Sequence, residues 1–489
     1  MMPSAADFQP LAIDFGVLAL ILSLILGDLL LGAKSGKILG LSAGLSLLVL
    51  LAATFNLNLN GSAFSGAYVG DAWSTFFKRL FLLSGGLAIL GGLDHVSRHY
   101  PHRQTEFYLM VLSSVLGMTL LPGARDLILL VVCFELMGVP LFVLAAYAKT
   151  DDSQGRLRHA PEAALKLYLV GVASTALMLF GLSWIYGMSG TTSIDRLMAA
   201  ANSPMITAGG VLVLAGLAFK IGAVPFHFWV ADTYEGSNTP FVAFLAVAPK
   251  LAGFVALAAV LQRGLNASDL QRPMLIAMAA ASIVIGNVLA ITQTNVKRLL
   301  AFSGVGHIGL ILLAFIPGDA PSMTMLLFYG AAYVVTNIGA FLVVEAIEDA
   351  EGDCSLQAFE GLIHRSPALA FAMLVFLLSL AGIPFVIGFW AKLYVFLAAW
   401  QAGLTWLVAL GAVAAVVGLF YYMQVARAMF MKPARAEAAA LPHRLGLTFA
   451  IAICLAGVIV LGVFPAPLLD QAERAAASFV LGPRQIAAF

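Results

Sequence analysis

The chain contains a long series of apolar stretches, each about 17–25 residues long, which is the length that crosses a bilayer once as a helix. We count about 14 of them along the chain. Their expected limits are 11–31, 38–55, 73–92, 106–122, 124–147, 161–185, 205–229, 239–262, 272–292, 299–316, 322–346, 366–398, 404–430 and 445–466. No stretch alternates polar and apolar residues at every second position, as a barrel strand would. The pattern therefore predicts an all-α polytopic membrane protein.

Composition agrees with a membrane chain and argues against several other classes. Charged residues make up 10% of the sequence, whereas about 25% is usual in soluble domains. Lys plus Arg number 26 and Asp plus Glu number 25, so the charge balance indicates no nucleic-acid partner. Cys133, Cys354 and Cys454 are far apart, and no P-loop and no GxGxxG after a strand occur. We therefore expect no flavin, NAD, ATP or Fe–S cofactor in this chain.

The loop charges predict an orientation, because cytoplasmic loops carry an excess of Lys and Arg. With the N-terminus outside, the cytoplasmic loops hold Lys34, Lys37, Arg98, Arg103, Lys149, Arg156, Arg158, Lys297, Arg298, Arg365, Lys432, Arg435 and Arg444. The opposite side holds the smaller set Lys78, Arg79, Arg125, Arg196, Arg263, Arg272, Arg474 and Arg484. An even number of spans then places both termini on the outer side. The first residues lack a basic segment, so we expect the first stretch to be a permanent helix.

Two of the stretches carry internal breaks, in FKIGAVPFHFW around Pro225 and in LAGIPFVIGFWAKLY around Gly382 and Pro384. A proline inside a helix frees the carbonyl four residues earlier, here at Ile221 and Leu380. Free backbone groups at membrane depth are tolerated only inside protein or beside a wet cavity. An ordinary proline kink explains either break alone. Two breaks five spans apart, each near a lysine, instead predict two broken helices in a transporter with two inverted five-helix repeats.

This repeat predicts four regions. They are residues 1–105 with the first three helices, 106–262 with the first repeat (helices 4–8), 263–431 with the second repeat (helices 9–13), and 432–489 with helix 14 and a tail.

Ionisable residues inside the apolar stretches indicate a chain that moves charge. They are Lys166, Lys220, Lys250, Lys392 and Glu135. A lysine at the centre of a membrane helix costs about 2.5–3.5 kcal/mol even on permissive scales, so such residues are rare and mostly functional. Lys166 lies closest to a helix end and has the alternative of reaching the interface.

Glu135 is the one acid near the middle of any stretch, so we expect it to partner Lys220. Burial disfavours the charged form of a lysine and a nearby carboxylate favours it, so a lysine between these effects can gain and lose a proton. A purely structural ion pair is the alternative. His227 and His307 also lie within the stretches and suit a proton relay, although a lone histidine is often only a core residue.

Other charged residues receive a plain structural interpretation. The acidic run Glu345, Glu348, Asp349, Glu351 and Asp353 is expected to be a solvated loop, with a partner surface as the alternative. Lys78 and Arg79 are expected to anchor a helix at the membrane interface. Asp232, Tyr234 and Glu235 are expected to lie in a short cytoplasmic turn, where an acid is either solvated or a helix cap, or has a gating role.

The stretch LAFKIGAVPFHFWVADTYEGSNTPFVAFLAVAPK, from Leu217 to Lys250, resembles the signature of the antiporter-like subunits of respiratory complex I (NADH-quinone oxidoreductase). Its YEG followed by TPFVAF is most similar to subunit N. FELMGVPLFVLAAY, EAALKLYLVGVAST, NVKRLLAFSGVGHIG and LAGIPFVIGFWAKLYVF follow in the family's order, over residues 106–430. The sequence departs at Ala231, where the family usually has proline, and at Ser237–Asn238, which affects the turn geometry.

The resemblance implies roles for the buried residues. Glu135 and Lys220 would form the coupling pair, Lys250 would be the central relay lysine and Lys392 the residue at the far half-channel, assisted by Lys166, His227 and His307. The chain would be a cofactor-free, non-redox subunit of a proton-translocating NADH:quinone oxidoreductase. FMN, Fe–S clusters and quinone would lie on other subunits, and M-like and K-like subunits would be its neighbours.

The resemblance implies that the chain lies in the bacterial inner membrane, in contact with membrane lipids. NADH and quinone would be partners of the whole complex, bound by other subunits. Two related readings stay open, a subunit of a multi-subunit cation/proton antiporter and a subunit of a membrane-bound hydrogenase-type complex. A scaffold that transmits no protons is a third reading, which the buried charges disfavour.

Overall fold

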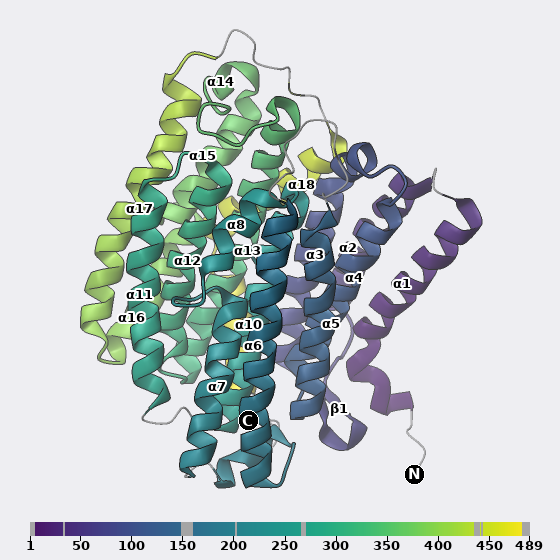
Figure 1. Cartoon of the computed structure of the whole chain (residues 1–489), viewed down its shortest axis with the longest axis vertical. Coiled ribbons are helices and arrows are strands. Elements are labelled where there is room, and N and C mark those ends of the chain that lie inside the picture. Colours follow the sequence, from purple (N-terminus) through teal and green to yellow (C-terminus); the bar gives the residue numbers. More distant parts are fainter. Residues whose placement is uncertain are drawn as a thin grey trace.

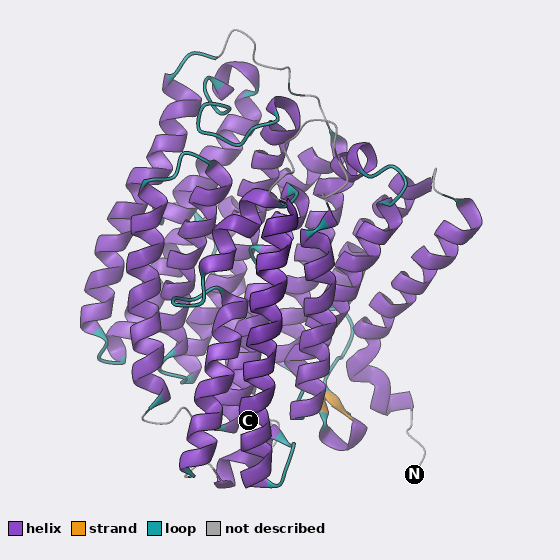
Figure 2. Cartoon of the chain, viewed as in Figure 1, coloured by secondary structure: helices purple, strands orange, loops and turns teal. Residues whose placement is uncertain are grey.

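The computed structural model describes residues 5–32, 35–147, 160–200, 203–265, 270–434, 441 and 444–481. In this part of the chain the protein is a bundle of long helices with one two-stranded antiparallel sheet (Figure 1, Figure 2). The predicted loop charges Lys34, Lys149, Arg156, Arg158, Arg435 and Arg484 lie outside the described residues.

The elements follow one another along the chain as a series of spans. The first group is η1 (Ala5–Leu11), α1 (Ala12–Leu31), α2 (Gly36–Ala53), β1 (Gly61–Ala63), η3 (Phe64–Gly66), β2 (Tyr68–Gly70), α3 (Ala72–His99), α4 (Gln104–Leu120), η4 (Leu121–Gly123), α5 (Leu127–Ala145) and α6 (Ala160–Ser189). The second is η7 (Ile194–Ala200), α7 (Pro204–Ile221), α8 (Phe228–Gly236), α9 (Thr239–Leu245), α10 (Ala248–Leu257), the π-helical η8 (Ala258–Gly264), α11 (Gln271–Ile291), α12 (Val296–Phe315) and α13 (Ala320–Glu351). The third is α14 (Leu362–Arg365), α15 (Pro367–Ala381), α16 (Ile387–Gln401), α17 (Thr405–Met431), α18 (Leu445–Val463) and α19 (Ala466–Leu481).

The predicted spans are confirmed as helices. Among the described residues, 13 helical segments are long and apolar enough to cross a membrane. The remaining predicted span is the broken pair α15 and α16, whose halves have 15 residues each and are too short to be counted singly. Asp232 and Glu235 lie on the helix α8 rather than in a turn.

Burial separates an inner group of helices from an outer group. The apolar windows of α13 and of the segment α9–α10–η8 are 100% buried, whereas those of α6, α17 and α18 are 33% buried. α13 packs against α9, α12, α15, α16 and α18 and so forms the centre of one side of the bundle. The outer helices expose apolar side chains, as expected for surfaces that meet lipid or another membrane chain.

Both helix breaks are made by a glycine rather than by the proline, which corrects the sequence-based explanation. α7 ends at Gly222 (φ 74°) and α15 at Gly382 (φ 85°), the left-handed conformation that glycine adopts without strain. In each case the amide after the glycine, at Ala223 or Ile383, donates to a carbonyl five residues back at 3.0 Å. This is the Schellman end of a helix, and a proline commonly follows it because it cannot continue the helix.

Two sets of basic residues mark the two ends of the bundle. We call the end that carries Lys37, Arg98, Lys297, Arg365 and Lys432 the basic end, where α14 lies at the top of Figure 1. Ion pairs connect its loops, for example Lys432 with Glu360 and Arg365 with Glu351. These charges therefore gather at one end, as the loop assignment predicts.

At the opposite end, the predicted interfacial anchor Lys78 is instead buried. Its Nζ donates to Asp14 Oδ2 at 2.5 Å and to Pro10 O at 2.9 Å, and its side chain is 1% exposed. This ion pair joins the start of α1 to α3. Lys78 could not be recognised as buried from its own span, because its partner lies on another helix.

The predicted C-terminal tail contains a further helix, α19. It packs against α3 and α13, and its Phe479 stacks on Trp73 with ring centroids 4.2 Å apart. The backbone amide of Trp73 also donates to Ser478 Oγ at 3.0 Å. α19 therefore closes the bundle at the end opposite the basic end.

Candidate functional site

Lys220 lies on the last turn of α7, immediately before the first break, and is buried. Its Nζ lies 5.0 Å from the ring centroids of Phe134 and Phe142, two aromatic residues of α5. A Cβ placed on Gly138 of α5 would come within 2.7 Å of this Nζ. The amine is therefore held against the backbone of α5, and the missing side chain at Gly138 makes room for it.

Glu135 lies on the same helix, about one turn before Gly138, and is half-buried. Thr175 of α6 donates its hydroxyl to Glu135 Oε1 at 2.9 Å. Glu135 is also the acid whose charge acts on Lys220, although the hydrogen bond to its carboxylate comes from Thr175 and not from the lysine. Glu135 and Lys220, the predicted pair, therefore both lie at α5, but their charged groups are not bonded to each other.

Lys250 lies at the centre of the bundle, on the inner helix α10. Its side chain is 1% exposed and its Nζ has no hydrogen-bond partner among the described residues. The Nζ lies 5.3 Å from the ring centroid of Tyr234 on α8. A Cβ placed on Gly222 would lie 3.8 Å from Cε of Lys250, and a Cβ placed on Gly304 would lie 3.3 Å from its Nζ. Lys250 therefore fills the space between the first break and α12.

His307 of α12 connects to two tyrosines on different helices. Its Nδ1 lies 2.6 Å from the hydroxyl of Tyr329 on α13, and its Nε2 lies 3.1 Å from that of Tyr422 on α17. Ser303 shares a further hydrogen bond with Tyr422. The direction of these bonds depends on which ring nitrogen carries the proton. The histidine is thus a junction in a buried hydrogen-bonded network.

Lys392 reaches back across the second break from α16. Its Nζ donates to the carbonyl of Ala381, the last residue of α15, at 2.9 Å. The sequence predicts a free carbonyl one residue earlier, at Leu380; the carbonyl that binds the lysine belongs to Ala381. A lysine at a helix C-terminus is favourable because the helix dipole places partial negative charge there.

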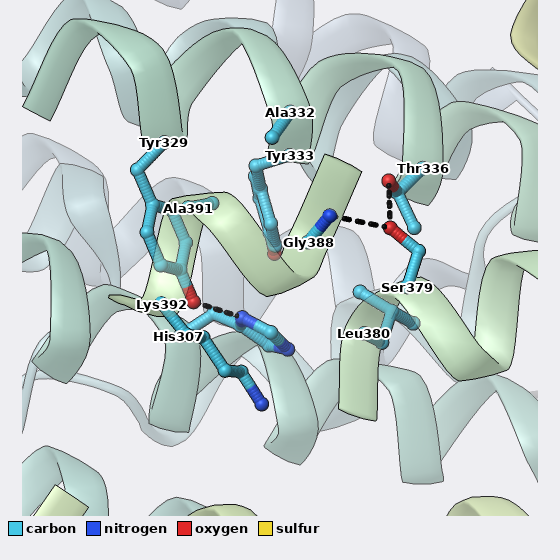
Figure 3. Close-up of a pocket in the computed structure, with 10 residues that line it drawn as sticks. All are labelled: His307, Tyr329, Ala332, Tyr333, Thr336, Ser379, Leu380, Gly388, Ala391 and Lys392. Atoms are coloured by element: carbon cyan, nitrogen blue, oxygen red, sulfur yellow. Dashed lines mark hydrogen bonds between the residues drawn. The ribbon is translucent and has the colours of Figure 1, made fainter. Parts of the chain in front are cut away.

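Two small cavities are each lined by both His307 and Lys392, and Figure 3 shows the one that Tyr329 also lines. One is lined also by Tyr329, Tyr333 and Ser379, and the other also by Tyr422. Each has room for about one water molecule. A proton can pass between groups that share a water, so these cavities join the histidine to the lysine.

The remaining distance between Lys250 and His307 is covered by Tyr333 of α13. Its hydroxyl would lie 2.9 Å from a Cβ at Gly304, the same position that is 3.3 Å from Lys250 Nζ. Its ring centroid lies 5.5 Å from that of His307. The buried polar groups therefore form a series from Lys250 through Tyr333 and His307 to Lys392. On the other side, a Cβ placed on Gly253, one turn after Lys250, would lie 3.7 Å from the Cβ of Lys220.

His227 lies in the first break, where it precedes α8. It is buried, its Nδ1 has no hydrogen-bond partner in the described part of the chain, and its ring packs on Phe228. Phe228 itself is 74% exposed. His227 therefore lies near the outer surface of the bundle rather than beside the central lysines.

Lys166 is not buried with the other lysines. Its side chain is 44% exposed, and its Nζ forms ion pairs with Glu162 at 2.8 Å and with Asp232 at 2.7 Å. Asp232 also binds Arg298 at 3.0 Å. Lys166 lies on the second turn of α6, close to the basic end, and its amine reaches polar partners there. This agrees with the alternative prediction that Lys166 extends to the membrane interface.

Sequence reasoning did not identify the tyrosines Tyr329, Tyr333 and Tyr422, and it placed Tyr234 only in the turn after the first break. One signal was available: on α13 the polar residues Tyr329, Tyr333 and Asn337 recur every fourth position and so share one face of a helix. An aromatic residue in an apolar span carries no other mark of function, because it also suits the core.

The acidic run is a solvated loop only at its end, where Asp353 is exposed beyond the end of α13, and the prediction is wrong for the earlier acids. Glu345, Glu348 and Asp349 lie on the last turns of α13, and all three carboxyl groups face the protein. Asp349 also has ring nitrogens of His95 and His99 nearby, and these three residues have a geometry that suits a metal ion. Arg444 and Arg98 already pair with Asp349, and two guanidinium groups at one carboxylate oppose a cation.

Comparison with known proteins agrees with this arrangement. The profile of the family described as NADH:quinone oxidoreductase/Mrp antiporter, transmembrane, matches residues 124–418. NADH-quinone oxidoreductase subunit N of Heliobacterium modesticaldum is 39% identical over 88% of this chain and 90% of its own length. The same subunit of Desulforamulus reducens is 35% identical over 97% of this chain and 99% of its own length.

Solved structures give the same result. A chain of respiratory complex I from Thermus thermophilus superposes with a TM-score of 0.81 at 32% identity, covering 94% of this chain and 99% of that one. A chain of the Mrp complex from Dietzia gives a TM-score of 0.85 at 22% identity, covering 98% and 99%. The second likeness shows a shared fold alone.

Proposed function

We propose that this chain, which belongs to the NADH:quinone oxidoreductase/Mrp antiporter family and resembles its subunit N members, translocates protons. It would do so in the membrane arm of a proton-pumping NADH:quinone oxidoreductase. One observation carries the proposal: buried ionisable and hydroxyl side chains follow one another from Lys250 to Lys392, and the amine of Lys250 has no hydrogen-bond partner in the described residues. Isolated buried charges are costly and seldom kept without a function.

The series suggests how a proton moves. The charge of Glu135 acts on Lys220, and a Cβ placed on Gly253, one turn after Lys250, would lie 3.7 Å from the Cβ of Lys220. Moving Glu135 away therefore makes the charged form of Lys220 less favourable. The proton of Lys220 then passes to Lys250, and from there by Tyr333 and His307 to Lys392. The chain supplies the binding sites for the proton, and the driving change in field comes from redox chemistry on other subunits.

Lys166 and His227 assist this series from its edges. Lys166 fixes Asp232 and so holds α8, which carries Tyr234 beneath Lys250. His227 sits in the first break, where the backbone leaves the regular helix between the end of α7 and the start of α8.

We further propose that the basic end faces the cytoplasm of a bacterial cell and that both termini face the periplasm, following the loop charges. The outer helices would meet lipid and the M-like and K-like subunits of the complex. FMN, the Fe–S clusters and quinone would be bound by partner subunits, and this chain would hold no cofactor.

The internal repeat is also a proposal, with residues 106–262 and 263–431 as two inverted five-helix units. The support is local: the two breaks have the same glycine conformation and the same pair of closing hydrogen bonds. A matched pair of discontinuous helices is typical of transporters built from repeats.

The test starts from the tagged chain purified from its native membrane in mild detergent. Co-purifying FMN and NADH:quinone reductase activity would support membership of the oxidoreductase. The complex is then reconstituted in vesicles, and we expect Lys220→Ala and Lys250→Ala to lose proton pumping while the complex stays assembled. Unchanged pumping in both variants would refute the proposal. Isolation without redox activity, together with cation-driven proton exchange, would favour the antiporter subunit instead.

A further inference from the structure

Three acidic residues on the last turns of α13 lie at the basic end, and two of them have clear partners. Glu348 binds Lys297 Nζ at 3.1 Å and accepts a hydrogen bond from Thr239. Asp349 pairs with Arg444 and Arg98. These contacts tie α13 to α9, α12, α3 and α18, and they explain the burial of both acids.

Glu345, the third acid, has a different environment. It is 1% exposed, and neither carboxylate oxygen has a hydrogen-bond partner among the residues that the structure describes. The charged groups around it are Asp349 and Glu348 on its own helix, Arg444 at the start of α18, and Asp94 on α3. A buried carboxyl group without a partner is costly in its charged form and is suited to hold a proton.

Helix spacing and two ring distances connect Glu345 with the central lysine, Lys250. Phe341 lies one helical turn before Glu345, and its ring centroid lies 5.7 Å from that of Tyr234. The ring of Tyr234 in turn lies 5.3 Å from Lys250 Nζ. The acid and the lysine are therefore separated by two aromatic side chains of neighbouring helices.

Other buried polar atoms in this region also lack partners in the described residues. They are the hydroxyl of Tyr234 and Nδ2 of Asn238, which stands next to Thr239 at the start of α9. Buried polar groups are nearly always hydrogen-bonded, by ordered water where protein atoms do not serve. The Tyr234 hydroxyl belongs to the ring beside Lys250, so it is available to relay a proton toward this lysine.

We propose that Glu345 is the proton-loading residue of this chain, which takes protons from the basic end and supplies them to Lys250 past Tyr234. The neutral Glu345 gives its proton to the neutral amine of Lys250, which leaves a carboxylate and an ammonium. The carboxylate then takes a proton from the water at the basic end. Arg444 offsets the negative charge in between. This inference rests on the proposed function, since it assumes that Lys250 carries protons.

The experiment uses the whole complex in vesicles, with NADH-driven proton pumping and NADH:quinone reductase activity measured together. We expect Glu345→Gln to lose as much pumping as Lys250→Ala, and Glu345→Asp to keep most of it. Glu351→Gln is the matched control, because Glu351 ends the same helix but pairs with Arg365. It should pump like the unmutated complex.

An infrared readout separates proton carrying from a structural role. Redox cycling of the unmutated complex should change the carbonyl band of a protonated buried carboxyl group, and this change should be absent in Glu345→Gln. If that variant fails to assemble, Tyr234→Phe replaces it, and reduced pumping is expected because the path loses one hydroxyl.

Normal pumping in Glu345→Gln beside a deficient Lys250→Ala would overturn this inference and leave the proposed function intact. Normal pumping in Lys250→Ala would instead refute the proposed function.

Discussion

The two helix breaks have the same backbone but use their lysines differently. At the first, Lys220 precedes the glycine and its amine rests between two phenyl rings and the backbone of α5. At the second, Lys392 follows the glycine and donates to the last carbonyl of α15 at 2.9 Å. At the first break, other side chains bond the backbone: Trp229 Nε1 donates to Phe219 O at 2.9 Å, and Ser282 Oγ accepts from Val224 N at 3.0 Å.

The amine of Lys220 therefore serves only as a charge, whereas the amine of Lys392 also supports the backbone. Lys220 is free to respond to Glu135, because no backbone group depends on its amine in the described structure. Lys392 has two tasks, since it lines the cavities with His307 and also completes the end of a helix. A lysine that holds a backbone carbonyl loses that bond when it moves, so the second break should resist movement more than the first.

The largest expected effect is at Gly388, which brings α16 against α15. A Cβ there would lie 1.8 Å from the carbonyl oxygen of Ser379, so Gly388→Ala must push two backbones apart. We expect a loss of about 3 kcal/mol or more in stability. The equivalent residue after the first break is Phe228, 74% exposed, and Phe228→Ala should be tolerated. Thermal unfolding of the purified chain in detergent compares the two, and equal losses would contradict a tighter second break.

The two lysines should differ next. Lys392→Met leaves the Ala381 carbonyl without its donor, whereas Lys220→Met removes no backbone hydrogen bond. We expect Lys392→Met to be less stable than Lys220→Met by about 2 kcal/mol, since an unmade buried hydrogen bond costs about that much. The same unfolding assay measures the difference. A larger loss in Lys220→Met would show that the amine of the first break supports the fold.

The glycines of the two breaks should give similar, smaller effects. Gly222→Ala and Gly382→Ala each place a Cβ on a left-handed residue, which costs about 1–2 kcal/mol. The added Cβ of Gly382→Ala would also lie 2.7 Å from Lys392 Cδ, so this variant should additionally reduce pumping. Unfolding and pumping assays on both variants test this. No loss of stability would show that the breaks tolerate another backbone conformation.

The smallest effect is expected at Lys166, which supports the first break from outside. Its ion pairs with Glu162 and Asp232 are partly exposed, and such pairs contribute little to stability. Lys166→Ala should therefore reduce pumping less than Lys220→Ala does, with assembly unchanged. Pumping rates of the two variants in one vesicle preparation decide the order. A loss equal to that of Lys220→Ala would place Lys166 within the proton path.

Much of the fold could be predicted from the sequence because a bilayer imposes a length and a composition on every span. α11, α12 and α17 begin and end within a few residues of their predicted limits for this reason. The breaks were also predictable in position, because Gly and Pro leave a plain mark in an apolar stretch. Their cause was misassigned, since φ at Gly222 and Gly382 is a property of the folded backbone.

The candidate site likewise contains residues that the sequence predicted and one whose burial it did not predict. Lys220, Lys250 and Lys392 were conspicuous because a charge in an apolar stretch needs a reason. Glu345 was taken for a loop residue, because a cluster of acids at the end of a stretch normally meets water. Its burial depends on α3 and α18, which are distant in sequence and cover the end of α13.

The sequence by itself determined the number of spans and their two interruptions, and it marked Lys220, Lys250 and Lys392 as groups at membrane depth, because these follow from the local cost of exposing polar groups to hydrocarbon. Only the tertiary structure decided which of those groups meet. It placed Lys78 on Asp14, Lys392 on Ala381 and Lys166 among the charges of the basic end, and it left Glu345 and Lys250 without partners in the described residues. Pairing depends on which helices pack together, and that choice is made by side-chain packing across the whole bundle.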